Sequence, residues 1–222
     1  MKDTGLLGIT LGGGEVSVPM QIAVLLTLLT LLPAVIMSVT PFLRITIVLH
    51  FLRQALGTQT TPSNQVLAGL ALFLTALLVA PLGTEIHDRA WLPLQAGKMT
   101  QAQALAEAAK PFKIFLAKYV REKDVKLFLE ISKSPPPRNA SDLELRVLVP
   151  AYILSELKTG FQIGAVLFLP FLVIDLLVAS VTLSVGMVQL PPVMVSAPFK
   201  ILLFVLVDGW NLLVGSLIKS FY

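Results

Sequence analysis

The residues best able to do chemistry in this sequence are charged side chains set inside long apolar stretches. Arg44 lies in one such stretch, and Asp175, Lys200 and Asp208 lie in another. A charge is costly in hydrocarbon, so residues of this kind usually face protein or water and mark a function. Asp175 and Lys200 lie on either side of a short turn at residues 186–192, which contains a glycine and a proline pair. The turn and its two apolar arms predict a helical hairpin.

The spacing of two of these charges predicts an ion pair. Asp175 lies 11 residues before Gly186 and Lys200 lies 8 residues after Pro192, so on helical arms their depths differ by about 4.5 Å. A lysine side chain covers that difference, and an unpaired charge would be costly at this depth. We expect the pair to form within one hairpin or between neighbouring copies. Asp208, about 12 Å further along the second arm, should have another partner; the alternative is a local bond to the Trp210 backbone or side chain.

Signatures of common catalytic and metal sites are missing from the sequence. It has no cysteine, no nucleophile elbow, no glycine-rich phosphate loop in its structural context and no HExxH helix. Glu85, His87 and Asp88 resemble a metal corner, but an ordinary helix end is the stronger interpretation. A net charge of +4 spread along the chain does not favour nucleic acid as a partner. We therefore predict that the chain is not an enzyme and holds no cofactor or metal.

The composition is that of a membrane protein. Hydrophobic residues make up 55% of the chain and charged residues only 14%, against about 25% charged in soluble domains. The charges are concentrated, since residues 85–158 hold 9 acidic and 12 basic residues between two apolar blocks. We expect a flexible N-terminal segment at 1–15, an apolar helical block at 16–84, a polar helical subdomain at 85–158 and an apolar hairpin at 159–222. The start lacks a secretory signal pattern, so insertion would use the first apolar helix, unless a leader precedes this sequence.

The apolar block at 16–84 predicts several long helices. The 28 residues from 16 to 43 carry no charge, which is enough for a membrane span of about 20 residues. Thr40 and Pro41 are typical of the cap and first turn of a new helix, which should end at Gly57. A second charge-free span is expected from about Ser63 to Gly83.

The polar subdomain at 85–158 predicts shorter helices. Thr100 and Gln103 fit a capping box that begins an alanine-rich helix ending before Pro111, where another helix would begin. An apolar stripe then runs through Phe115 to Phe128. Either the subdomain buries this stripe itself, or Phe115 and Phe128 contact a neighbouring copy. The many basic residues suggest a cytoplasmic loop, but that rule loses force beyond about 60 residues, so the charge count leaves the side open.

Two classes of function fit these features: a small-solute carrier or channel, and a structural or pore subunit of a larger machine. Carriers usually show broken helices repeated in two similar halves, and no such repeat occurs here.

Several runs of sequence resemble signatures of the FliP family of flagellar type III export-gate proteins, which is related to the SctR proteins of injectisomes. These runs are residues 64–75, 150–164, 169–175 and 198–210. The resemblance covers about residues 18–222. Residues 53–57 and 208–216 are closer to the flagellar branch, and an injectisome homologue is the lesser alternative.

The resemblance implies a fold and a function. The fold would be an all-α membrane-associated protein in which long kinked helical hairpins flank the small middle subdomain, with copies assembled into a helical ring. The chain would be a homo-oligomer, a pentamer in the family, and would form a channel with FliQ and FliR. Unfolded flagellar substrates would pass through it, with FlhA and FlhB as further partners. It would lie in the bacterial inner membrane at the flagellar basal body, with the middle subdomain in the periplasm.

The same resemblance points to particular residues. Contacts between copies would involve Phe115, Phe128 and Glu156. Charge contacts within or between subunits are expected at Arg44, Asp175, Lys200 and Asp208. The pore gasket would be the turn formed by Met187, Val188, Gln189, Leu190, Pro191 and Pro192. The family's turn carries consecutive methionines, of which only Met187 remains here, so the seal would be apolar bulk from Met187, Val188 and Leu190.

Overall fold

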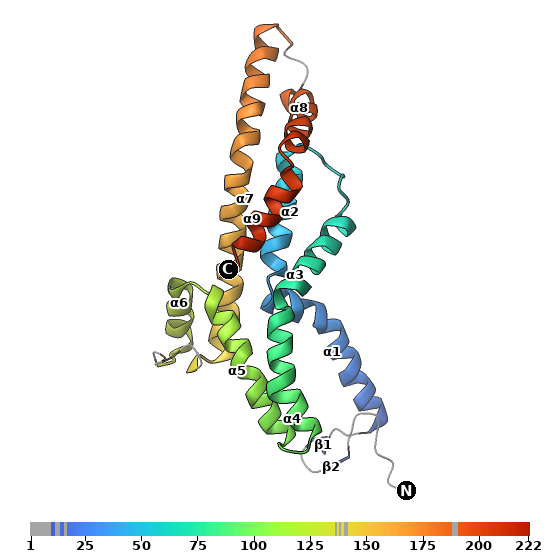
Figure 1. Ribbon diagram of the computed structural model, residues 1–222, viewed down its shortest axis with the longest axis vertical. Helices are drawn as coiled ribbons and strands as arrows, with labels where there is room; N and C mark the ends of the chain where they lie inside the picture. The colour runs from blue at the N-terminus through green and yellow to red at the C-terminus, as the bar shows by residue number, and fades with distance from the viewer. Residues whose placement is uncertain are drawn as a thin grey trace.

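The protein is almost entirely helical. A computed structural model describes residues 10, 11, 14, 15, 17–135, 137, 139, 142–187 and 191–222. Within this part of the chain the only strands are β1 (Thr10–Leu11) and β2 (Gly14–Glu15), which pair antiparallel. The molecule is elongated, with the end of α7 at one end and β1 and β2 at the other (Figure 1). The predicted all-α class is therefore confirmed; the ring assembly remains a prediction.

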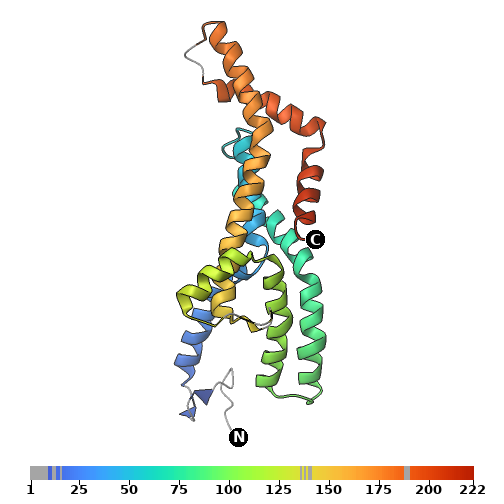
Figure 2. The same cartoon turned by 90° about the vertical axis from the view of Figure 1, so that its left-hand side faces the viewer.

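The first apolar block forms three long helices. α1 (Val18–Val39) is a mostly exposed helix that extends away from the others (Figures 1 and 2). α2 (Phe42–Ala55) begins directly after Pro41, as expected, and Gly57 follows its end with a φ of 75°. α3 (Asn64–Ile86) is capped by Ser63, whose hydroxyl accepts a hydrogen bond from the Val66 amide, and it continues past Gly83. A π-helical turn, η1 (His87–Trp91), and the short α4 (Leu92–Gln95) follow.

The middle subdomain corrects one prediction. α5 (Gln101–Tyr119) begins at the expected capping box of Thr100 and Gln103 but continues through Pro111. A proline inside a helix removes one backbone hydrogen bond and costs roughly 3 kcal/mol. The packing of α5 outweighs this cost, because Pro111 is buried and Leu116, one turn and a half later, is fully buried. α6 (Glu122–Ser132) follows after a sharp turn.

The longest element is α7 (Leu145–Ser184), a helix of 40 residues. At 1.5 Å per residue it is about 60 Å long, roughly twice the hydrocarbon thickness of a bilayer. Its first part belongs to the middle subdomain, where Leu148 and Tyr152 form an apolar cluster with Leu116 of α5. The expected boundary between residues 158 and 159 falls inside this helix.

The second arm of the hairpin is not one helix. α8 (Pro192–Leu206) and α9 (Gly209–Lys219) meet at an angle of 69°. α9 turns back toward the middle of the molecule, where the C-terminal residues lie (Figure 2). The second arm is therefore not the unbroken helix that was expected, since the helix breaks at Asp208.

The main apolar core centres on α2. Its buried residues pack with residues of α3, α7, α8 and α9. α2 and α7 approach closely at Gly160 and Gly164: a Cβ at Gly164 would lie 2.5 Å from the Phe51 ring, and one at Gly160 would lie 3.2 Å from Ile47. Small residues spaced four apart allow such close contact between helices in membranes.

Three of the described helical stretches are long and apolar enough to cross a membrane: Val18–Val39, Asn64–Gln95 and Leu145–Ser184. The bent pair of α8 and α9 would make a fourth if both helices formed one span.

Candidate functional site

Asp175 of α7 and Lys200 of α8 form an ion pair near the hairpin turn, and we call this pair the clasp. Lys200 Nζ lies 2.6 Å from Asp175 Oδ2, and the lysine side chain is 1% exposed. The Ser196 hydroxyl, one helical turn before Lys200, donates to the other carboxylate oxygen, Asp175 Oδ1. The structure thus brings Asp175 and Lys200 together within one hairpin, which is the first of the two arrangements that their spacing allowed. Because both carboxylate oxygens are bound, the pair fixes the register of the two arms.

A second buried charge cluster centres on Arg44 of α2. Its guanidinium binds Glu156 of α7 through two hydrogen bonds, one of them 2.9 Å from Nε to Oε2 and the other from Nη2 to Oε1. Nη1 donates to the carbonyl and the hydroxyl of Ser220, at 3.1 and 3.2 Å. The cationic group also lies 3.9 Å from the centre of the Phe221 ring. Arg44 therefore joins α2, α7 and the residues that follow α9, and we call this set the Arg44 node.

The aromatic residues around the node tie the C-terminal residues to α5. Tyr119 donates its hydroxyl proton to the Phe221 carbonyl at 3.0 Å, and the two rings meet edge to face at 5.5 Å. Phe221 is 2% exposed. Sequence reasoning missed Tyr119, Ser220 and Phe221, because a serine and an aromatic residue beyond a helix end form no recognisable motif.

Glu156 was expected to contact a neighbouring copy. Its side chain is fully buried and its partner is Arg44 of the same chain. In this chain the carboxylate therefore stabilises an internal contact, and a role between copies stays a prediction.

A third polar cluster joins α6 to α7. Asp124 accepts hydrogen bonds from Arg121 Nε at 3.0 Å and from the Ser155 hydroxyl at 2.6 Å. Burial by itself would raise the pKa of Asp124. The hydrogen bonds from Arg121 and Ser155, with the positive charges of Arg121 and Lys158, outweigh burial and lower this pKa below its usual value. The ionised carboxylate is thus the form that the fold prefers.

The turn that carries the expected gasket is only partly described. α7 ends in a Schellman motif, in which the Met187 amide bonds the Thr182 carbonyl and Gly186 has a φ of 80°. Met187 is partly exposed, and Pro191 and Pro192 begin α8. Val188, Gln189 and Leu190 lie outside the described residues.

Asp208, Phe115 and Phe128 were also expected to make functional contacts, and in the structure each has partners within the chain. Asp208 is exposed, and its carboxylate accepts a hydrogen bond from the Asn211 side chain at 3.1 Å. The bond is local, but its partner is Asn211 and not the expected Trp210. Phe115 and Phe128 are half-buried against the apolar cluster of the middle subdomain, so the subdomain buries part of the stripe itself.

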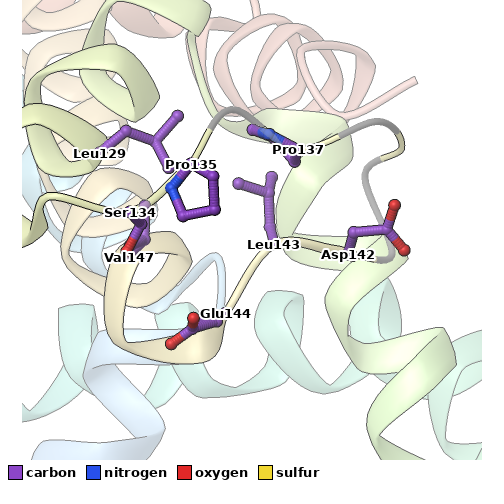
Figure 3. A pocket seen from close by; sticks show the side chains of 8 residues that line it. All are labelled: Leu129, Ser134, Pro135, Pro137, Asp142, Leu143, Glu144 and Val147. Atoms are coloured by element: carbon purple, nitrogen blue, oxygen red, sulfur yellow. The ribbon is translucent and has the colours of Figure 1, made fainter.

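A small cavity of about 220 Å³ lies beside the end of α6. Figure 3 shows that Leu129, Pro135 and Leu143 gather at its centre, whereas the carboxylates of Asp142 and Glu144 point away from them. Both carboxylates have local partners, since Asp142 accepts a hydrogen bond from the Asn139 amide and Glu144 pairs with Arg146.

The possible metal corner does not lie at a helix end, although the sequence suggested one. Residues 85–88 are inside a helical stretch that runs from Asn64 to Gln95 through the π-helical turn. His87 and the adjacent Asp88 are exposed and interact with each other at 3.1 Å, while Glu85 pairs with Arg89 at 3.1 Å. Among the described residues, no group of three or more His, Cys, Asp or Glu side chains is arranged to hold a metal ion.

These features define the class of protein: an α-helical membrane protein whose apolar helices are joined by buried charge pairs. Within this class, the chain belongs to the FliP family, whose model matches residues 25–217.

Curated relatives support the same assignment. The flagellar biosynthetic protein FliP of Bacillus subtilis is 50% identical over 207 residues, which cover 93% of this chain and 94% of the relative. The protein of the same name from Pectobacterium carotovorum is 48% identical, covering 95% of this chain and 82% of the relative. That of Borreliella burgdorferi is 44% identical, with 96% and 85% covered.

Proposed function

We propose that this chain is a core subunit of the flagellar type III protein-export gate. The observation that carries the proposal is membership of the FliP family over residues 25–217, with relatives that are named flagellar biosynthetic proteins. These relatives are flagellar, which favours the flagellar gate over an injectisome. The chain would act by forming a passage for protein substrates and not as an enzyme.

In this proposal several copies, five in the family, assemble with FliQ and FliR into a helical ring. One supporting observation is the apolar exposure of the hairpin: Leu176, Val181, Met194 and Leu206 are each more than 60% exposed in the isolated chain. A monomer in water rarely exposes so continuous an apolar surface. Lipid or neighbouring hairpins would cover it, and Phe115 and Phe128 would add contacts between middle subdomains on the periplasmic side.

The pore would lie where the turns of the copies meet. The Asp175–Lys200 clasp holds the two arms in register near the turn, so each copy would present its turn at the same level. Met187, together with Val188, Gln189, Leu190, Pro191 and Pro192, would then close the resting channel. Methionine is flexible and fills irregular gaps, a property suited to a seal that opens for unfolded flagellar subunits. FlhA and FlhB would be further partners at the inner membrane.

Complementation tests this function. We expect the chain, expressed in a flagellated bacterium that lacks its own FliP, to restore swimming and the appearance of flagellar subunits in the medium. The purified chain should form an oligomer large enough for symmetry analysis by electron microscopy. A chain that inserts and accumulates normally but restores neither swimming nor export, even when its matching FliQ and FliR are supplied, would overturn the proposal.

A further inference from the structure

The arm formed by α8 and α9 has a built-in break. Asp208 adopts a φ of 52°, a left-handed conformation that residues with a Cβ seldom adopt. The next residue is Gly209, where a Cβ would lie 2.3 Å from the Phe204 ring. In the form with the 69° bend, a side chain at position 209 would therefore force the Phe204 ring to move.

The far end of the arm is held by contacts at the Arg44 node. Arg44 donates two hydrogen bonds to Ser220 and lies over the Phe221 ring, while Tyr119 binds the Phe221 carbonyl. Between the break and these contacts, Leu213 and Leu217 of α9 are buried. The bent form thus has polar contacts at its end as well as apolar packing along its length.

The lengths of the helices give the arm two possible arrangements. α8 has 15 residues and α9 has 11, so each is about 22 Å or less in length and neither crosses roughly 30 Å of hydrocarbon. A single straight helix from Pro192 to Lys219 would be about 42 Å long and would cross it. The observed arm is folded back, and the same residues would be long enough to form a membrane span if the arm were straight.

We propose that Asp208 and Gly209 are the hinge, and Arg44 with Ser220 and Phe221 the latch, of an arm that switches between a bent and a straight state. Engagement of Ser220 and Phe221 by Arg44 holds the bent state; release of the latch lets α8 and α9 align. The bent state also creates an apolar groove of about 560 Å³ between α7 and the arm, with Val166 and Leu212 among its lining. Straightening would remove this groove. The proposal does not depend on the export function, since it concerns the conformation of a single chain.

Spin labels test the switch directly, because the chain has no cysteine of its own. Cysteines introduced at the exposed positions Lys126 of α6 and Lys219 of α9 would carry the labels, in full-length protein reconstituted into lipid nanodiscs. We expect the otherwise native chain to give a dominant distance that matches the bent state. Straightening α9 by 69° would move its end by on the order of 20 Å for a helix of about 17 Å.

Variants separate the hinge from the latch. The double change Asp208→Ala with Gly209→Ala should make the straight state the majority, since alanine at Gly209 meets the Phe204 ring in the bent form. Asp208→Gly, which tolerates the left-handed conformation, is the matched control and should keep the native distance. Phe221→Ala should produce a second, shifted population without altering the hinge.

The distance measurements can refute the hinge, the latch and the bent resting state separately. An unchanged single distance in the double alanine variant would refute the hinge. An unchanged distance in Phe221→Ala, and also in Tyr119→Phe combined with Ser220→Ala, would refute the latch. A native chain that shows only the straight distance would refute the bent resting state.

Discussion

The two buried charge pairs of this protein hold the chain together in different ways. The Asp175–Lys200 clasp joins residues 25 positions apart on one hairpin, and the aspartate side chain remains 22% exposed. The Arg44–Glu156 pair joins residues 112 positions apart, and its side chains are 4% and 0% exposed. The clasp sets the register of two neighbouring arms, whereas the Arg44 node sets the arrangement of three separate segments. Loss of the node should therefore destabilise the whole chain, and loss of the clasp mainly its hairpin.

The largest effect is expected from breaking the node on one side. Arg44→Ala leaves Glu156 buried without its partner, which should destabilise the protein by about 3–5 kcal/mol. Replacing both partners by apolar residues, Arg44→Met with Glu156→Leu, should recover much of this loss. Thermal or denaturant unfolding in detergent measures both. A double variant no more stable than Arg44→Ala would contradict the view that the unpaired carboxylate causes the loss.

Breaking the clasp should have a smaller effect. Lys200→Ala removes one hydrogen bond to a charged group, worth about 1.5–3 kcal/mol. The Asp175 carboxylate that remains is 22% exposed and keeps its hydrogen bond from Ser196. Reversal of either charge, Asp175→Lys or Lys200→Asp, should abolish assembly, and the combined reversal should restore it. Size-exclusion chromatography of the purified complex compares the three variants with the native chain. If the combined reversal assembles as poorly as the single ones, the pair does not act as a unit.

The close crossing of α2 and α7 lies between the two charge pairs in the sequence of α7. Gly164→Ala should cost about 1–3 kcal/mol, because the new methyl group meets the Phe51 ring. Gly69→Ala in α3 is the matched control, since a Cβ there has no neighbour within 4 Å. That change should be neutral, or stabilising by about 0.5–1 kcal/mol. Equal melting temperatures for the two variants would argue against tight packing at Gly164.

The Asp124 cluster holds together the middle subdomain, and its contribution to the stability of the protein should depend on pH. The folded state lowers the pKa of Asp124 below the ordinary value of 3.8, so its contribution to stability is complete above about 3.8 and is lost as the pH falls through the lower, folded pKa. Asp124→Asn should remove that dependence and cost on the order of 1–2 kcal/mol at neutral pH. Unfolding of both proteins between pH 2 and pH 6 measures the difference. Parallel stability curves would show that another group controls the acid transition.

The smallest effect on stability is expected at the turn. Met187→Ala with Val188→Ala should change the free energy of unfolding by no more than about 0.5 kcal/mol, as is usual away from a packed core. The assembled complex should nevertheless leak ions, because the variant removes apolar bulk from the proposed seal. Conductance across planar bilayers provides the measurement. Native conductance in a correctly assembled variant would count against a gasket role for these residues.

Local signals in the sequence predicted the starts of several helices. Thr40 with Pro41, and Thr100 with Gln103, act within a single helical turn, so their effect can be predicted without knowing the fold. Pro111 misled the same reasoning, because the packing that keeps α5 continuous involves residues of α7. The break at Asp208 was missed for a similar reason: an aspartate before a glycine inside an apolar run does not reveal whether the helix continues.

The sequence by itself determined that the chain is helical, apolar in two blocks and charged at a few interior positions. It also predicted that Asp175 pairs with Lys200, because the rise per residue of a helix and a short turn fix their relative depths; the structure decided that the pair forms within one hairpin. Only the tertiary structure decided the partners of Arg44, since Glu156 and Ser220 lie 112 and 176 residues away and reach it through the packing of α2, α7 and α9. The direction of α9 depends on the same contacts, because they hold its far end in place after the helix has broken.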